Sequence, residues 1–149
     1  GSGYFNMDEN QLYNLFIKTY LLLSDGDRRF FLRFQLSQAR YYALIHIHNE
    51  PGITLTELSK RLLCTKGNTT RILNSLEQDG LLIRQLDAYD KRVYQLKLSE
   101  SGDLKLSQVK SDYQKLNKDR FNSLSPNELM GVASLIELLV KDLECQLKK

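Results

Sequence analysis

The chain has 149 residues, of which 42% are hydrophobic and 26% are charged. That is enough for one globular domain with its own core, and it is too apolar for a disordered chain. With 21 Lys and Arg against 18 Asp and Glu, the net charge of +3 excludes a polybasic or acidic tail protein and does not by itself indicate nucleic-acid binding.

No apolar segment is long enough to span a bilayer or to form a signal-peptide core, so we expect a soluble cytoplasmic protein without a membrane partner. The two cysteines, Cys64 and Cys145, cannot form a disulfide framework, which fits a reducing compartment. Because Cys and His do not cluster, we expect no metal site, and nothing predicts a cofactor. Residues 1–6 are interpreted as a cloning remnant before a native start at Met7.

The N-terminal part of the chain predicts two helices. Apolar residues recur at helical spacing over 12–23, after a helix start at Asp8. The polar segment 24–27 includes a glycine and predicts a break or a weakening of this helix. Ser37 is expected to cap a second helix, which ends at the turn 49–52.

The middle of the chain predicts a helix-turn-helix. Thr54 and Glu57 have the spacing of a capping box, in which the hydroxyl and the carboxylate each accept a bond from a free backbone N–H. They open a short helix over 55–63. Thr65 is expected to cap a second helix over 66–79, and two short helices joined in this way form a helix-turn-helix.

A β-hairpin is predicted directly after it. The segments 81–86 and 93–98 have strand character, and the second alternates polar and apolar residues. The charged segment 87–92 between them forms the tip. A helix-turn-helix followed by such a hairpin is a winged helix, so we expect a mainly α fold with a small β-hairpin wing.

The last third predicts further helices, with a strong start at the sequence Ser125-Pro126-Asn127-Glu128. Apolar stripes before residue 37 and after residue 98 exceed what a winged helix of about 60 residues can cover. We therefore divide the chain into a winged helix-turn-helix over 37–98 and a helical dimerisation region over 7–36 and 99–149. The expected partner is a second copy, giving a homodimer.

The predicted helix 66–79 has one apolar face and one polar face. Arg71, Asn74 and Thr70 on the polar face suit guanine, adenine and the thymine methyl group respectively. Gly67 would let the backbone approach a phosphate or a groove wall. The alternative is a polar face that meets only water. With the wing included, the candidate DNA-binding residues are Thr65, Lys66, Gly67, Asn68, Thr70, Arg71, Asn74, Lys91 and Arg92.

The wing supports this interpretation through its position and its charge. Lys91 and Arg92 lie at the predicted tip, where side chains can reach a minor groove or a phosphate. Asp90 is expected to bind turn amides or a neighbouring arginine and so to order the wing. Between residues 60 and 92 there are seven basic and four acidic residues, whereas the rest of the chain has fourteen of each. The whole positive excess thus lies where phosphate contact is expected, although a solvated turn would have a similar composition.

The order of these features resembles the MarR family of bacterial transcription regulators. The resemblance is carried by residues 55–62, 68–77, 79–84 and 90–92 and by the strand-to-helix junction 96–102. It implies a homodimer that binds a near-palindromic operator in double-stranded DNA, with interlocking terminal helices. It also implies that Arg92 is the wing arginine and that Asp90 is its ordering partner.

The resemblance further implies a trigger that releases the DNA. A small aromatic or anionic effector could bind a cleft formed by Arg40, Tyr41, Tyr42 and His46, although an aromatic pair on a helix is also typical of a core. Thiol oxidation at Cys64 is the alternative trigger. Basic neighbours next to a helix start favour a thiolate, whereas a small apolar plug in the turn is the structural alternative.

These features together predict a sequence-specific DNA-binding regulator and not an enzyme, because no catalytic arrangement is present in the sequence. We expect a repressor, since a protein that covers a promoter needs no further contact surface. The alternative from another class is a winged helix that serves as a protein-interaction module without DNA binding.

Overall fold

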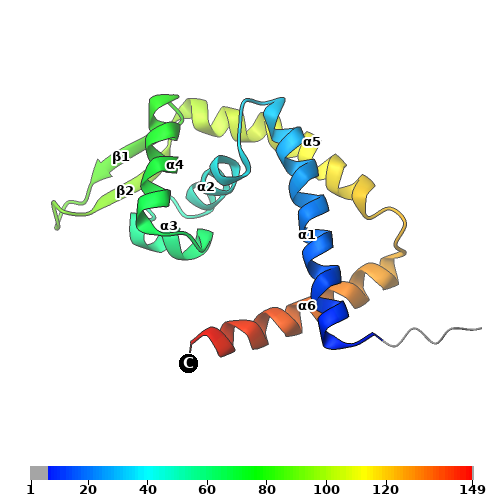
Figure 1. The fold of residues 1–149 in the computed structure, drawn as a ribbon. Coiled ribbons are helices and arrows are strands. Elements are labelled where there is room, and N and C mark those ends of the chain that lie inside the picture. Colours follow the sequence, from blue (N-terminus) through cyan, green and yellow to red (C-terminus); the bar gives the residue numbers. More distant parts are fainter. Residues whose placement is uncertain (1–6, 149) are drawn as a thin grey trace, which may run out of the picture. The chain divides into compact units, whose positions relative to one another are not determined.

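The computed structural model describes residues 7–148, so the expected cloning remnant, residues 1–6, lies outside the described residues. Within that range the chain forms six helices and one antiparallel pair of strands: α1 (Glu9–Leu32), α2 (Gln38–Asn49), α3 (Leu55–Leu62), α4 (Lys66–Gln78), β1 (Leu82–Leu86), β2 (Tyr94–Leu98), α5 (Glu100–Arg120) and α6 (Pro126–Leu147) (Figure 1). The expected mainly α fold with a hairpin wing is confirmed. None of the described helices combines the length and apolarity needed to cross a membrane. The chain divides into two compact units, residues 1–109 and 110–149, and the boundary falls within α5.

Helix α1 is continuous, and the predicted break at 24–27 is wrong. The helix starts at Asp8 as expected, with a capping box. Asp25 supports the polar segment from within the helix, because its Oδ2 lies 3.0 Å from Arg29 Nε one turn later. Asp27 is buried and accepts a hydrogen bond of 3.2 Å from the Tyr42 hydroxyl of α2. Packing against α2 and a local ion pair thus offset the low helix propensity of this segment.

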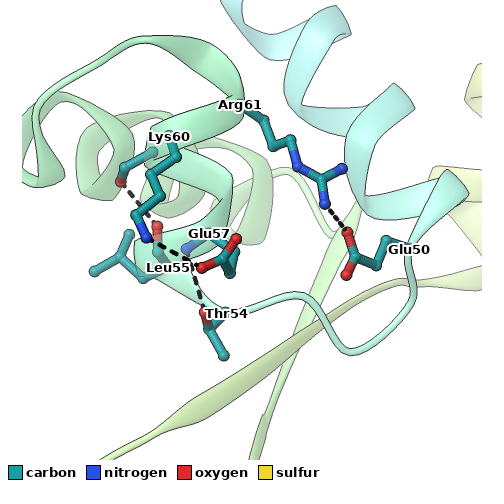
Figure 2. A network of polar contacts seen from close by, with 7 residues as sticks. Glu50, Thr54, Leu55, Glu57, Lys60 and Arg61 are labelled. Atoms are coloured by element: carbon teal, nitrogen blue, oxygen red, sulfur yellow. Dashed lines mark hydrogen bonds and ion pairs between the residues drawn. The ribbon is translucent and has the colours of Figure 1, made fainter. Parts of the chain in front are cut away.

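The predicted caps of α2 and α3 are present, with one difference. The Ser37 hydroxyl accepts from the Arg40 N–H at 3.2 Å, and the Thr54 hydroxyl accepts from the Glu57 N–H at 3.3 Å. The reciprocal half of the predicted Thr54 capping box is not formed. The Glu57 carboxylate instead lies 3.4 Å from Lys60 Nζ, as Figure 2 shows. A nearby ammonium group has replaced the backbone N–H as its partner.

A buried pair of hydroxyl groups joins α3 to α4. The Ser59 hydroxyl donates to Thr69 Oγ1 at 3.0 Å, and the exposed fractions of the two residues are 5% and 0%. Each hydroxyl also lies within hydrogen-bond distance of a carbonyl of its own helix, Leu55 O at 2.8 Å and Thr65 O at 3.0 Å. The two helices of the helix-turn-helix are therefore fixed against each other by a polar contact inside an apolar core.

The hairpin closes the same core. Strands β1 and β2 pair in antiparallel register from Leu82 opposite Leu98 to Leu86 opposite Tyr94. Leu96 is fully buried, and its backbone forms a bridge to Ile53, the residue that precedes the cap of α3. The largest fully buried side chains come from α1, α2, α3, α4, β2 and α5: Phe31, Leu44, Ile47, Leu58, Thr69, Leu73, Leu76, Leu96 and Val109.

The junction between β2 and α5 requires a glycine. The Ser99 hydroxyl donates to Gly80 O at 2.5 Å and accepts from the Gly102 N–H at 3.0 Å. The Ser99 N–H donates to Leu81 O at 3.0 Å. This close approach leaves no room for a side chain at Gly102, where a Cβ atom would lie 2.2 Å from Leu81 O.

The second unit begins within α5 and contains α6. The predicted start of α6 is confirmed, with a capping box between Ser125 and Glu128 and with Pro126 at the first helical position. None of the described α6 residues is buried within the chain. Its exposed large apolar residues are Leu129, Met130, Val132, Leu135, Ile136, Leu138, Val140, Leu143 and Leu147.

We predict that Gly102→Ala destabilises the protein. The new methyl group would clash with the Leu81 carbonyl, which is backbone and cannot move away cheaply, so a loss of about 1–3 kcal/mol or more is expected. Gly67→Ala is the matched control, because the nearest atom to its new Cβ is Thr65 Oγ1 at 4.0 Å. Thermal unfolding at one fixed protein concentration should show a lower midpoint for Gly102→Ala only. Equal midpoints for both variants would contradict the close approach of Gly102 to the Leu81 carbonyl.

Candidate nucleic-acid interface

Helix α4 separates its apolar and polar residues as the sequence predicts. Thr69, Leu73 and Leu76 are buried against the core. On the remaining surface Lys66, Gly67, Asn68, Arg71 and Asn74 are exposed, and Thr70 is half-buried. The structure therefore brings the candidate residues of this helix together on its solvent side.

Two threonines among the candidates already have local partners. The Thr65 hydroxyl caps α4 by accepting from the Asn68 N–H at 3.1 Å. The Thr70 hydroxyl donates to Lys66 O at 2.8 Å. The proton of the Thr70 hydroxyl is therefore used within the helix, which leaves its methyl group and an acceptor oxygen for a ligand.

Asn74 is engaged by a residue that the sequence did not indicate. Arg84, in β1, donates from Nη2 to Asn74 Oδ1 at 2.5 Å. Its Nε lies 3.1 Å from Glu77 Oε2. Arg84 thus connects the wing strand to the solvent side of α4. No sequence spacing predicts this contact, because ten residues and a change of element separate the two side chains.

The wing tip is held mainly by Asp87, which was not among the predicted site residues. Its carboxylate accepts from the backbone N–H groups of Tyr89 at 2.8 Å and Asp90 at 3.0 Å, and from Gln95 Nε2 at 3.0 Å. Asp90 contacts a turn amide and the neighbouring arginine: its Oδ1 accepts from the Arg92 N–H at 3.0 Å and lies 3.2 Å from Arg92 Nε. The known tendency of Asp to bind the amide two residues later could have identified Asp87.

These bonds keep Asp87 ionised. The Tyr89 and Asp90 amides and the Gln95 side chain hold the pKa of the Asp87 carboxyl below its ordinary value of 3.8. Because the pKa of Asp87 is lower in the folded state, the ionised carboxylate stabilises the wing tip fully when the pH is above 3.8. The stabilisation is lost as the pH falls through the lowered pKa, so the tip keeps its geometry at neutral pH.

Ion pairing leaves three cations of this region without a carboxylate. Glu77, Asp79 and Asp90, which are acids of the segment 60–92, pair with Arg84, Arg40 and Arg92. Among residues 7–148, no carboxylate lies within 4.0 Å of the charged groups of Lys66, Arg71 or Lys91, and all three side chains are exposed. Within the segment 60–92, the cations without a carboxylate partner therefore lie on α4 and on the wing.

The other basic residues of the helix-turn-helix are turned toward acids. Arg61 Nη2 lies 2.7 Å from Glu50 Oε2 at the end of α2, and Lys60 lies beside Glu57 (Figure 2). These four side chains form two partly exposed ion pairs. Their charges cancel locally, so α3 contributes less than α4 to a positive surface.

The four residues of the predicted effector cleft do not share one environment. Tyr41 is buried and stacks on Phe31 with ring centroids 4.4 Å apart, and burial raises the pKa of its phenol. Burial, followed by the Asp27 carboxylate, raises the pKa of Tyr42 as well. His46 is half-buried.

Arg40 instead lines a cavity of about 440 Å³ in the first unit. It pairs with Asp79, the C-cap residue of α4, and donates from Nη1 to Gln35 O at 3.2 Å. Tyr41, Tyr42 and His46 are not among the residues that line this cavity, which are Gln35, Arg40, Asp79, Leu81, Ser101, Leu104, Lys105 and Gln108.

Cys64 lies half-buried in the turn between α3 and α4, where its thiol donates to Leu62 O at 3.4 Å. It lines an apolar groove whose other residues are Thr56, Ser59, Lys60, Leu63 and Lys66. Over the described part of the chain, no three His, Cys, Asp or Glu side chains are grouped so that they could hold a metal ion.

Comparisons with known proteins agree with this geometry. Residues 34–93 match the model of the MarR family. The HTH-type transcriptional regulator BilQ of Clostridioides difficile is 26% identical over 111 residues, which are 74% of each chain. The HTH-type transcriptional regulator PetP of Rhodobacter capsulatus is 30% identical over 104 residues, which are 69% of this chain and 62% of PetP.

Solved structures share the fold. Streptococcus pneumoniae FabT in complex with DNA superposes with a TM-score of 0.80 at 22% identity, covering 93% of this chain and 99% of that chain. The S. aureus MepR–DNA complex gives a TM-score of 0.79 at 20% identity, covering 87% of this chain and 96% of that chain. The winged helix and the long terminal helices therefore recur in proteins of very different sequence.

Proposed function

Because this chain belongs to the MarR family of winged helix-turn-helix transcription regulators, we propose that it binds double-stranded DNA sequence-specifically, as a homodimer on a near-palindromic operator. The observation that carries the proposal is that the three cations of the segment 60–92 without a carboxylate partner among the described residues, Lys66, Arg71 and Lys91, all lie on α4 or on the wing. The FabT and MepR structures, which contain DNA, support it. We propose repression as the outcome, since a dimer lying across a promoter excludes other proteins without a further contact surface.

In this proposal α4 enters the major groove, and the wing reaches the adjacent minor groove. Arg71 has the length and the planar donor fork to bind guanine at O6 and N7. Lys66, in the first turn of α4, and Lys91, at the wing tip, contact phosphates. Arg92 keeps its terminal nitrogens available, because its bond to Asp90 uses Nε, and its side chain is exposed.

We predict that Lys66→Gln and Lys91→Gln each weaken duplex binding and each reduce the salt dependence. Each lost phosphate contact reduces the magnitude of the slope of log affinity against log salt by about 0.9.

Arg71→Ala should relax base preference, whereas Arg92→Ala should weaken binding to many sequences alike. Fluorescence anisotropy with a duplex selected from a random pool measures the affinity and its salt dependence, and the same measurement on duplexes with single base changes measures the base preference.

Lys60→Gln is the matched control for this experiment, because its ammonium is already paired with Glu57 and its loss should leave the slope unchanged. If the parent protein bound no duplex at about 50 mM salt, where phosphate contacts are strong, the DNA-binding proposal would fail. A winged helix that serves as a protein-interaction module would then be the better account.

The proposed homodimer accounts for the apolar surfaces at both ends of the chain. In the first unit, α1 exposes Leu12, Tyr13, Leu15, Phe16, Ile17, Tyr20, Leu21 and Leu22. In the second unit, α6 has no buried residue among those described. Apolar surfaces of this extent are rare on soluble monomers and indicate an interface. A second copy of the chain supplies matching surfaces, and two-fold symmetry would space the two α4 helices by about 34 Å, one turn of DNA.

We predict that Leu135→Glu, on α6, shifts the protein from dimer to monomer, because a buried unpaired carboxylate is unfavourable in an apolar interface. Leu63→Glu is the control. Leu63 is more exposed, at 91% against 70%, but lies in the helix-turn-helix, outside both terminal helices. Sedimentation velocity at micromolar concentration measures the effect. A monomeric parent protein, or an unchanged dimer for Leu135→Glu, would remove these surfaces from the proposed interface.

We also propose that a small anionic or aromatic effector releases the DNA from this protein. The cavity beside Arg40 supports this, because Lys105 adds a second cation and Leu81 and Leu104 add apolar surface. An anion there would compete with Asp79, the C-cap residue of α4, for Arg40. Benzoate, used as a probe, should reduce duplex binding by the parent and not by Arg40→Ala. Release by peroxide that is lost in Cys64→Ser, without any benzoate effect, would favour the thiol alternative.

A further inference from the structure

The side chain of Asn74 is held in place by a cation from another element. Its Oδ1 accepts from Arg84 Nη2 at 2.5 Å. Arg84 also forms an ion pair with Glu77, which lies three residues after Asn74 on the same helix, with Nε 3.1 Å from Oε2. The Arg84 side chain is only 24% exposed, so this guanidinium is largely withdrawn from water. A planar arginine held at two points orients its partner more firmly than a flexible lysine would.

This contact changes what Asn74 can offer to a base. An asparagine recognises adenine with both ends of its amide: the oxygen accepts from the N6 amino group and the nitrogen donates to N7. In this chain the oxygen already accepts a charge-assisted hydrogen bond, which is stronger than the bond that a neutral amino group would give. The amide keeps both of its N–H donors, but only one lone pair remains on its oxygen, and that lone pair lies beside a guanidinium group.

We propose that Arg84 is a positioning residue for base selection, which biases Asn74 away from adenine and toward bases that accept hydrogen bonds from its amide N–H groups. Guanine presents two acceptors, N7 and O6, to the major groove, whereas adenine presents an acceptor and a donor. The base facing Asn74 is therefore guanine. This inference rests on the proposed function, because it requires α4 to lie in a major groove.

Charge supports the same choice of base. The guanidinium of Arg84 lies next to the Asn74 amide, so an adenine amino group placed there would meet further N–H donors. The acceptor edge of guanine would meet the same donors favourably. Glu77 neutralises the charge of Arg84 without removing it from Asn74, since one guanidinium serves both side chains.

A purely structural role for Arg84 makes a different prediction. If Arg84 only joined β1 to α4, its loss would lower stability and weaken binding to all duplexes by the same factor. A positioning role moves the base preference at one position of each half-site. Sequence selection separates the two roles, because it reports preference independently of overall affinity.

The experiment selects duplexes from a random-sequence pool with the parent protein, Asn74→Ala, Arg84→Met and the double variant. The position that loses its preference in Asn74→Ala identifies the base facing Asn74. We expect the parent to prefer guanine over adenine there by about tenfold, within the range of one good side chain–base pair. Arg84→Met should reverse that preference toward adenine, and in the Asn74→Ala background it should change no base preference.

Several outcomes would overturn the inference. One is that the parent protein prefers adenine at the position whose base preference is lost in Asn74→Ala. This test needs only a substitution at an exposed helix position, so it does not depend on whether Arg84→Met folds. Another is an unchanged guanine preference in a folded Arg84→Met variant, with its fold checked by circular dichroism. If the parent selects no duplex at low salt, the proposed function itself fails, and the two failures are therefore distinguishable.

Discussion

The contact between Ser59 and Thr69 fixes how α4 lies against the rest of the winged helix. Both hydroxyls are almost completely removed from water, and they lie 3.0 Å apart between α3 and α4. Buried polar groups without partners are destabilising, so rotation of α4 about its axis would break this contact and expose Leu73 and Leu76 as well. With Thr69 held inward, helical geometry places Arg71 and Asn74 on the solvent side.

Around that fixed helix, the four acids of residues 60–92 are engaged in ion pairs or hydrogen bonds, whereas three cations of the same segment have no carboxylate partner in the described part of the chain. The N-terminal end of α4 is capped by Thr65, its C-terminal end is tied through Asp79 to Arg40, and its middle is tied through Asn74 and Glu77 to Arg84. Two of these contacts pair the carboxylates of Asp79 and Glu77 with arginines, and those carboxylates would otherwise weaken the positive field of the surface. A modest net charge of +3 can therefore suffice, because the ion pairs determine where the charge remains unpaired.

The sequence predicts local features of this fold well and features that depend on distant residues poorly. The caps at Ser37, Thr65 and Ser125 follow from a few adjacent residues, and all three are present. The break expected in α1 is absent because Asp27 finds its partner in α2, far away in the chain. A pattern within 24–27 contains no information about that contact.

The candidate site divides in the same way. Helical periodicity places the polar residues of α4 on one face, and hairpin chemistry places Asp90 next to Arg92. The Arg84–Asn74 bond and the cavity beside Arg40 involve side chains from different elements, so only the folded structure brings them together. Tyr41 shows the opposite case. It was a candidate for lining an effector cleft, but in the structure it is buried in the core and stacks on Phe31.

The most direct measurement of the central claim is amide hydrogen exchange of the protein with and without a selected duplex. The account predicts slower exchange with DNA over residues 66–78 of α4 and over the wing residues 87–93, with little change in the exchange of α6. Slower exchange confined to the terminal helices, or none in α4 and the wing under conditions of saturating duplex, would contradict it.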